Sequence, residues 1–175
     1  MVQRCLRGDA KAQQKLFELF YGKMLAVCLR YTKDREEAKD MMQDGFMKVF
    51  QKLEQYTFTA PLDAWVRRIM VNTAIDHYRK NAAEPIAKDI EDAYEVHEET
   101  DVISDMNHAE LLQCLQHLPA GYRMVFNMYV IEGFSHKEIA EAMNVSEGTS
   151  KSQLSKARLY LQKIIANRFS SEKNG

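Results

Sequence analysis

The sequence predicts an all-α protein made of two small helical domains joined by an acidic linker. Three observations support this fold class. Turn-forming residues are scarce, with seven Gly and three Pro in 175 residues, whereas a β-sandwich or barrel needs a turn signal every ~8–12 residues. Apolar residues recur at the spacings of amphipathic helices. Charged residues, finally, are divided unevenly along the chain.

The net charge of −1 conceals a strongly acidic middle segment. Residues 1–81 hold 15 basic and 10 acidic residues, residues 82–106 hold one Lys and nine acids, and residues 107–175 hold eight basic and six acidic residues. A single-sign charge run with little apolar periodicity is typical of a solvated linker, so we place domains at 1–81 and 107–170. The linker either acts only as a spacer, or mimics nucleic-acid charge in a partner's basic channel or over the protein's own basic faces.

The sequence also predicts a cytoplasmic protein without membrane insertion. No stretch approaches the roughly 18 consecutive apolar residues of a spanning helix, and the N-terminus lacks the apolar core of a signal peptide. Cys5, Cys28 and Cys114 are an odd count without C-x-x-C spacing, which fits a reducing compartment and small buried hydrophobes.

The first domain begins with one or two amphipathic helices from Asp9 onward, with Gly22 as a candidate break. A further helix is expected from Asp34, a good N-cap residue, to Leu53. The apolar positions of this helix are Ala38, Met41, Met42, Gly45, Phe46, Val49, Phe50 and Leu53.

The opposite face of the Asp34–Leu53 helix is acidic. Glu37, Asp40 and Asp44 lie at i, i+3 and i+7, a pattern compatible with a metal site, a solvated face or a docking face. Di-metal sites in helical bundles use Glu-x-x-His pairs, and no His in the chain follows a Glu by three residues. We therefore predict no metal.

The third helix, roughly Leu62–Asn81, follows a connection with two aromatic residues, Tyr56 and Phe58. On a helical wheel one face carries Trp65, Arg68, Asn72, Asp76 and Arg79. Such a face has the groups needed to stack on bases, read their edges and neutralise phosphates. The alternative is a solvated amphipathic helix with a buried Trp. His77 falls beside the core positions, where we expect a hydrogen-bonded structural role.

The second domain begins with an amphipathic helix at residues 107–118, broken by Pro119-Ala120-Gly121 before an apolar helix that ends at Gly133. Ser135-His136-Lys137-Glu138 is a capping box that begins a short helix. A tight turn at residues 144–146 then leads to a longer helix from Glu147 to about Arg168. This order is the helix-turn-helix pattern, whose second helix enters a DNA major groove.

The second helix of this pair separates apolar from basic residues. The predicted buried stripe is Leu154, Ala157, Leu161 and Ile164, and the outward side holds Lys151, Ser152, Ser155 and Lys156. From residue 148 to residue 169 there are five basic residues and no acidic one, as phosphate contact requires. The alternative is a structural helix pair with a solvated basic face.

These motifs, in this order, resemble the extracytoplasmic-function (ECF) sigma factors of bacterial RNA polymerase. The resemblance rests on DREEAKDMMQDGFMKVFQKL, LDAWVRRIMVNTAIDHYRKN and LQHLPAGYRMVFNMYVIEGFSHKEIAEAMNVSEGTSKSQLSKAR, and it runs from about Gly8 to Ile165. It implies a two-domain initiation factor that binds core polymerase and carries it to promoter DNA. An anti-sigma partner is a further expectation of this family.

The resemblance also implies roles for single residues. In the family, a D-x-x-Q-[DE]-x-F helix docks on the clamp helices of the largest polymerase subunit; the residues that match it are Asp40, Gln43, Asp44 and Phe46. The residues expected to capture the −10 element as single strand are Tyr56, Phe58, Trp65, Arg68, Asn72, Asp76, Arg79 and Lys80. Ala60-Pro61-Leu62 departs from the small-Ser-Phe sequence often present there, which changes the residues of the base pocket.

The helix-turn-helix resembles the −35 reader of the family. The residues at its contacting positions are Ser146, Thr149, Lys151, Ser152, Ser155, Lys156 and Arg158. Gln153 stands where many relatives have Arg, so we expect a weaker phosphate contact or an altered specificity there.

Two other classes of function are weighed against a sigma factor. An ordinary helix-turn-helix regulator would be a homodimer on palindromic DNA. An enzyme is disfavoured because the sequence lacks a phosphate-cradling glycine loop, G-x-S-x-G, H-E-x-x-H and Cys/His pairs at ligand spacing. We predict no catalytic residue and no cofactor.

Overall fold

The computed structural model describes residues 1–81 and 107–172, with side chains placed up to residue 167, and these residues form helices without any strand. The predicted all-α fold class is thus confirmed. The chain divides into two compact units, Met1–His77 and Tyr78–Gly175. The division falls inside a helix, slightly before the predicted domain end at residue 81. The acidic linker at residues 82–106 lies outside the described residues.

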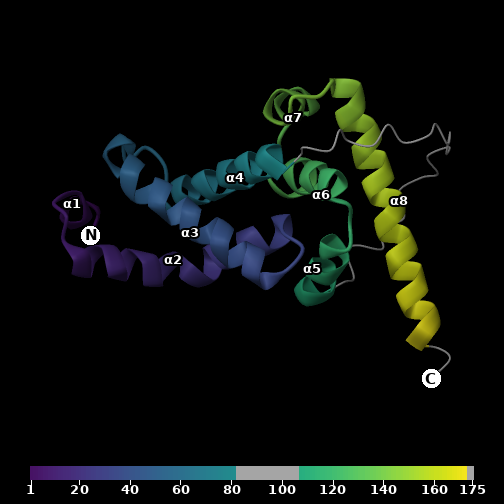
Figure 1. The fold of residues 1–175 in the computed structure, drawn as a ribbon, viewed down its shortest axis with the longest axis horizontal. Helices are drawn as coiled ribbons and strands as arrows, with labels where there is room; N and C mark the ends of the chain where they lie inside the picture. The colour runs from purple at the N-terminus through teal and green to yellow at the C-terminus, as the bar shows by residue number, and fades with distance from the viewer. Residues whose placement is uncertain (82–106, 173–175) are drawn as a thin grey trace. The chain divides into compact units, whose positions relative to one another are not determined.

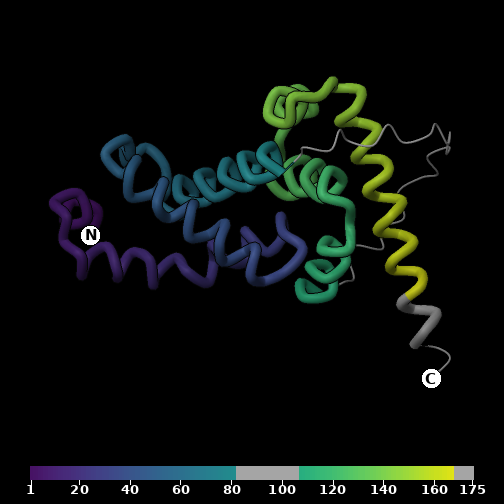
Figure 2. Tube along the Cα trace, in the orientation of Figure 1, coloured from purple at the N-terminus to yellow at the C-terminus, as the bar shows by residue number. Residues whose placement is uncertain are grey.

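The N-terminal unit contains α1 (Val2–Leu6), α2 (Ala10–Tyr31), α3 (Arg35–Lys52), the 3₁₀ turn η1 (Leu53–Gln55) and most of α4 (Leu62–Asn81). The chain turns back between α2 and α3, which lie side by side (Figures 1 and 2). The largest fully buried side chains in this unit come from the three long helices and from η1: Leu16, Val49, Leu53, Val66 and Met70.

Local sequence signals explain where these helices begin. Asp34 caps α3, because its carboxylate accepts a hydrogen bond from the Glu37 amide at 2.9 Å. Gly22, the candidate break, does not interrupt α2: of the one or two helices expected from Asp9 onward, the structure shows one continuous helix across this position. It lies on the exposed side of one continuous helix with no neighbouring atom where a side chain would begin, so the unfavourable helix propensity of Gly is tolerated.

The C-terminal unit is built around α8 (Glu147–Glu172), which packs against α5 (His108–Gln116), α6 (Ala120–Phe126) and α7 (His136–Met143). A π-helical turn, η2 (Asn127–Ile131), continues α6. Asn107 caps α5 in a second capping box with Glu110. The helix break predicted at Pro119-Ala120-Gly121 is shorter than expected, because α6 already begins at Ala120 and contains Gly121.

Two positions of α8 differ from the sequence prediction. Ile165 is buried with 3% exposure, whereas Ile164 is half-exposed, because the stripe Leu154, Ala157, Leu161 continues in a step of four residues. Gln153 is also buried, with 3% exposure, and lies beside Gly121 of α6. A buried side chain cannot contact a phosphate, so the exchange of Arg for Gln at this position is a change of packing.

Candidate functional site

Of the four residues of α3 predicted to dock on a partner, all but Phe46 are exposed. Asp40, Gln43 and Asp44 are exposed, whereas Phe46 is only 3% exposed and its ring lies 4.7 Å from that of Phe17. The predicted direct contact of Phe46 with a partner is therefore replaced by a supporting role, in which the ring holds α3 against α2. Asp40 forms no ion pair among the described residues, so its carboxylate is available to an external cation.

A hydrogen bond and an ion pair connect α3 with α4. The Asp44 carboxylate lies 2.8 Å from His77 Nε2, and Lys48 Nζ lies 2.8 Å from Asp76 Oδ2. His77 therefore has the hydrogen-bonded structural role expected from the sequence. The Lys48 partner of Asp76 was not predicted, because the two residues lie on different helices with a sequence separation of 28, and no local pattern pairs them. Both pairs are partly exposed, so each contributes at most about 0.2–1 kcal/mol to stability.

The loop between η1 and α4 presents a cluster of three aromatic rings. The Tyr56 ring lies 4.6 Å from that of Phe58 and 5.4 Å from that of Trp65. The Tyr56 hydroxyl donates a hydrogen bond to the Ala60 carbonyl at 2.6 Å, which closes the loop. Phe58 has a φ of +59° and is 63% exposed. Strained, exposed side chains of this kind concentrate at functional sites, and an exposed ring beside two others offers a stacking surface for a base.

The outward face of α4 is polar and exposed. Arg68, Asn72, Arg79 and Lys80 are exposed, and Asp76 is half-buried by its pairing with Lys48. Ile69, Met70 and Thr73 point the other way into the core. The structure thus places the residues predicted for the −10 element along one exposed face that begins at the aromatic loop.

The helix-turn-helix is held by two caps and a left-handed residue. The Ser135 side chain accepts the Glu138 amide at 3.2 Å, and the Glu138 carboxylate accepts the Ser135 amide at 2.7 Å. The Ser135 amide and the Ser135 hydroxyl both donate to the Glu138 carboxylate, and these two bonds hold the pKa of Glu138 below its ordinary value. Asn144 ends α7 with φ +56°, a conformation that Asn tolerates. Ser146 then accepts the Thr149 amide at 3.0 Å and starts α8.

A half-buried histidine joins the helices of this motif, and its role was not predicted from the sequence. The His136 ring stacks on Tyr129 at a centroid distance of 4.5 Å, and His136 Nδ1 lies 2.9 Å from Ser150 Oγ. Burial lowers the pKa of His136, and the nearby charge of Lys151 lowers it further. The neutral imidazole therefore predominates at pH 7, and it joins η2, α7 and α8.

The predicted −35 residues lie on the exposed side of α8. Ser146, Lys151 and Ser152 are exposed, and the half-buried members of the set are Thr149, Ser155, Lys156 and Arg158. The Ser146 hydroxyl is already used as a cap, because it accepts the Thr149 amide; it also lies 2.9 Å from Thr149 Oγ1. Lys151 and Ser152 are therefore the side chains most accessible to DNA.

Comparison with known proteins identifies the family. The model of sigma-70 region 2 matches residues 16–84, and the model of sigma-70 region 4 matches residues 108–161. The chain is 29% identical to the RNA polymerase sigma-H factor of Pseudomonas aeruginosa (94% of this chain, 92% of the relative) and 27% identical to the ECF RNA polymerase sigma-E factor of Haemophilus influenzae (94% and 93%). The chain belongs to the ECF sigma factors. The resemblance inferred from the sequence is confirmed.

The sigma factor also shares its fold with a solved structure. The sigma factor RpoE of Bartonella quintana, crystallised with the anti-sigma factor NepR, aligns with a TM-score of 0.52 and 24% identity over 90% of this chain and 98% of that one. Sigma factors are initiation factors and not enzymes. Within residues 1–81 and 107–172, no group of three metal-ligating side chains is present. No helix in these ranges is long and apolar enough to cross a membrane.

Proposed function

We infer that this ECF sigma factor binds core RNA polymerase in the cytoplasm, directs it to promoters and opens the −10 element for transcription initiation. The observation that carries this inference is the order of regions 2 and 4 along the chain, each with an exposed polar face of the expected kind. The protein lends specificity to the polymerase and performs no catalysis itself. The regulator alternative gains no support from these observations.

Core polymerase binding is proposed for the exposed face of α3. Asp40, Gln43 and Asp44 offer carboxylates and an amide to a basic partner surface, and charge complementarity orients and speeds such docking. Asp40→Asn should weaken the complex with core polymerase by about 2–5-fold, the range of one partly exposed ion pair. Glu54→Gln, an equal charge change on η1, is the control and should leave the affinity unchanged.

Capture of the −10 element is proposed for the aromatic loop and the outward face of α4. A flipped base requires a few kcal/mol of unstacking, which stacking on aromatic rings at ~1–3 kcal/mol per base offsets. Phe58 and Tyr56 supply these rings, Asn72 supplies an amide for a base edge, and Arg68, Arg79 and Lys80 supply charge for phosphates.

Recognition of the −35 element is proposed for the first turns of α8. Lys151 and Ser152 lie on the exposed side near the start of the helix, where recognition helices contact base edges. Arg158 and Lys156 lie further along the helix and extend the basic surface to the phosphate backbone. We also propose an anti-sigma partner, since the related RpoE structure contains one.

Run-off transcription on a promoter library tests the proposed function. Purified core polymerase is assayed with and without the full chain, and we expect protein-dependent transcripts that share −35 and −10 sequences. Absence of transcripts, together with no complex with core at low salt, would refute the sigma function. A stable homodimer that binds a palindrome without polymerase would instead establish the regulator alternative.

A further inference from the structure

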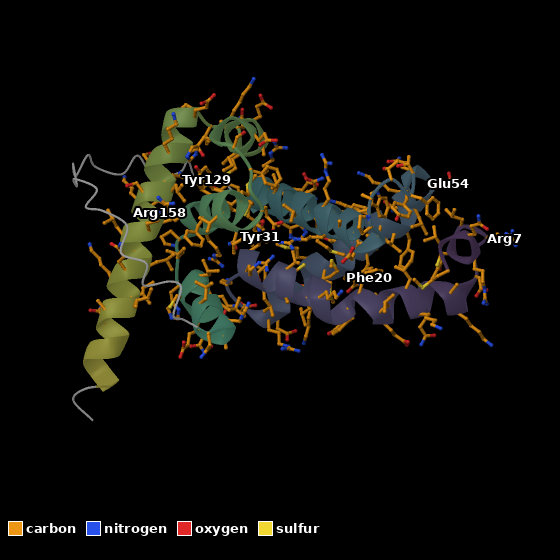
Figure 3. The ribbon with its side chains drawn as sticks, turned by 180° about the vertical axis from the view of Figure 1, so that it is seen from behind. Arg7, Phe20, Tyr31, Glu54, Tyr129 and Arg158 are labelled. Carbon is orange, nitrogen blue, oxygen red and sulfur yellow. The ribbon has the colours of Figure 1, made fainter. Side chains whose placement is uncertain are left out.

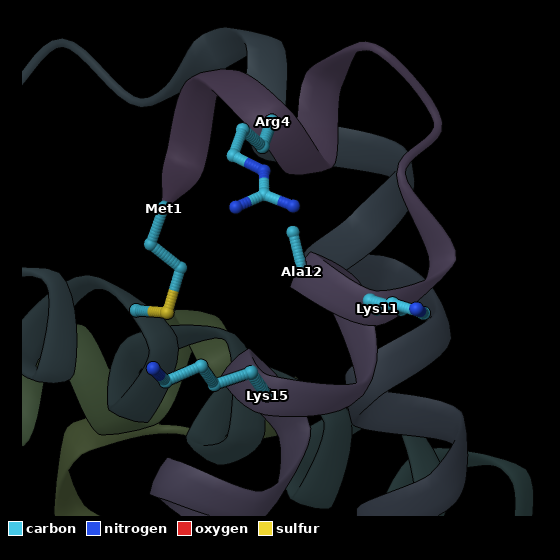
Figure 4. Close-up of a pocket in the computed structure, with 5 residues that line it drawn as sticks. All are labelled: Met1, Arg4, Lys11, Ala12 and Lys15. Atoms are coloured by element: carbon cyan, nitrogen blue, oxygen red, sulfur yellow. The ribbon is translucent and has the colours of Figure 1, made fainter.

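A cavity between α1 and α2 is a poor candidate for a binding site. It has a volume of about 270 Å³ and is lined by Met1, Arg4, Lys11, Ala12 and Lys15 (Figure 4). The lining is mostly apolar, and the Lys11 ammonium points away from the space. The Arg4 guanidinium is already paired with Asp9 at 2.7 Å. A side chain whose role is still open lies instead in the C-terminal unit.

This side chain is His136, the first residue of α7, which contacts both η2 and α8. Its ring stacks on Tyr129 of η2 with a centroid distance of 4.5 Å and an interplanar angle of 21°. On α8, Ser150 Oγ lies 2.9 Å from His136 Nδ1. Figure 3 shows Tyr129 and Arg158, from η2 and α8, in the same part of the C-terminal unit. One imidazole therefore ties the two helices of the helix-turn-helix to each other and to η2.

Ser150 connects this imidazole with the residues proposed to read the −35 element. The Ser150 side chain is fully buried, with 0% exposure, and it directly precedes Lys151 and Ser152, which are exposed. Successive residues of a helix are related by a fixed rotation and a rise of about 1.5 Å. A bond that fixes Ser150 therefore also fixes the directions in which Lys151 and Ser152 leave α8.

Apolar packing between α7 and α8 defines their relative position less sharply than this bond does. The buried side chains of the pair include Ile139 and Met143 on α7 and Leu154 and Ala157 on α8. Burial of apolar surface is non-directional, so a small slide or rotation keeps most of it. A hydrogen bond weakens steeply as its angle and distance change, so the His136–Ser150 bond selects one arrangement.

His136 itself is poorly suited to neutralise a phosphate. Burial is the main cause that lowers the pKa of the imidazole, the charges of Lys151 and Arg158 lower this pKa further, and Glu147 opposes them. The ring is therefore neutral at pH 7. An effect of His136 on DNA binding then acts through the placement of α8 and not through charge.

We propose that His136 is a positioning residue for −35 recognition, which holds α8 at the rotation and depth at which Lys151 and Ser152 meet the base edges. The proposal rests on the −35 role proposed above for α8. Contacts to base edges specify the sequence and need hydrogen-bond geometry, whereas phosphate contacts are independent of sequence. Loss of the His136–Ser150 bond should thus lower discrimination between promoters more than it lowers general affinity for DNA.

Binding of the complex of core polymerase and full chain to two promoter duplexes tests the proposal. One duplex carries the −35 sequence found by run-off transcription, the other a scrambled −35 sequence, and the ratio of the two affinities is the −35 preference. His136→Phe keeps a ring beside Tyr129 but cannot bond to Ser150, and Ser150→Ala removes the same bond from α8. Each should lower the preference about 3–10-fold, the range of one hydrogen bond, and leave affinity for the scrambled duplex unchanged.

Further variants separate positioning from a general structural role. The double variant of His136→Phe with Ser150→Ala should be no worse than either single variant, because both remove one bond. His136→Asn should retain more preference than His136→Phe, since its amide can bond to Ser150 Oγ. His117→Phe is the matched control and should leave the preference unchanged, because the exposed His117 ring bonds to the Gln113 carbonyl within α5.

The outcomes distinguish this proposal from the proposed −35 role. If His136→Phe and Ser150→Ala keep the preference, or His136→Asn retains no more than His136→Phe, the bond does not position α8. If they weaken binding to both duplexes equally, His136 supports the fold or contacts a phosphate, and the positioning role is wrong. If the wild-type complex shows no −35 preference, the proposed role of α8 itself fails. The Ser150 hydroxyl can turn to the carbonyl four residues earlier in α8, so circular dichroism should show the variants folded.

Discussion

Replacing Lys151 by Ala should remove one phosphate contact from the −35 interface. Lys151 is exposed near the start of α8 and forms no ion pair among the described residues, so its charge is available to DNA. One lost contact lowers the slope of log affinity against log salt by about 0.9 on duplex DNA. The counterion-release contribution to log affinity is zero at the 1 M reference concentration of salt. Loss of one contact therefore weakens binding roughly 8-fold at 0.1 M salt and roughly 4-fold at 0.2 M salt.

The assay is binding of the polymerase complex to labelled promoter duplex over a salt series. Lys163→Ala is the matched control, because Lys163 carries the same charge on the same helix about 18 Å further along the axis. We expect the slope to fall for Lys151→Ala and to stay unchanged for the control. An unchanged slope for Lys151→Ala, or an equal fall for Lys163→Ala, would refute a specific phosphate contact at Lys151.

Three further predictions concern α4 and the helix-turn-helix. Asn72→Ala should reduce transcription while leaving core binding intact, and equal loss of both would make Asn72 structural. Asp76→Asn releases the Lys48 ammonium, so single-strand affinity should rise about 5-fold at 0.1 M salt; a fall would mean that Asp76 accepts a hydrogen bond from a base. Ser135→Ala should cost about 0.5–2 kcal/mol of stability, the usual value of a cap. Because the folded pKa of Glu138 is lowered, this cost, measured by thermal unfolding, should shrink as the pH falls below about 4.5; a constant cost would contradict the capping box.

Signals that act within one turn of a helix were predicted well. Asp34 at the start of α3, and Ser135 and Ser146 in the helix-turn-helix, cap their helices as expected, because a cap needs only a side chain and an amide two or three residues away. The helix-turn-helix followed from these caps and the apolar spacing. The five-residue helix α1 was missed because it is too short to show an apolar period.

Features that depend on tertiary packing were not predictable from local pattern. The Lys48–Asp76 pair joins two helices, and the His136–Ser150 contact joins the two halves of the helix-turn-helix. For Phe46 the sequence contained two conflicting indications: the docking motif placed it at a partner surface, whereas the apolar spacing placed it on the core side, where the structure shows its ring against Phe17. The spacing of a motif alone does not show which of its residues face the core of the protein.

The polar contacts between α3 and α4 decide which variants report function cleanly. Asp44 belongs to the proposed polymerase face and Asp76 to the proposed −10 face, yet each carboxylate also joins α3 to α4 through a 2.8 Å contact. Substitution of either residue therefore changes a binding group and an internal polar contact at once. Asp40 and Asn72 are exposed on the same two helices and have no such partner among the described residues. Loss of binding in Asp40 or Asn72 variants is thus attributable to the interface, whereas the same loss in Asp44 or Asp76 variants requires a parallel measurement of stability.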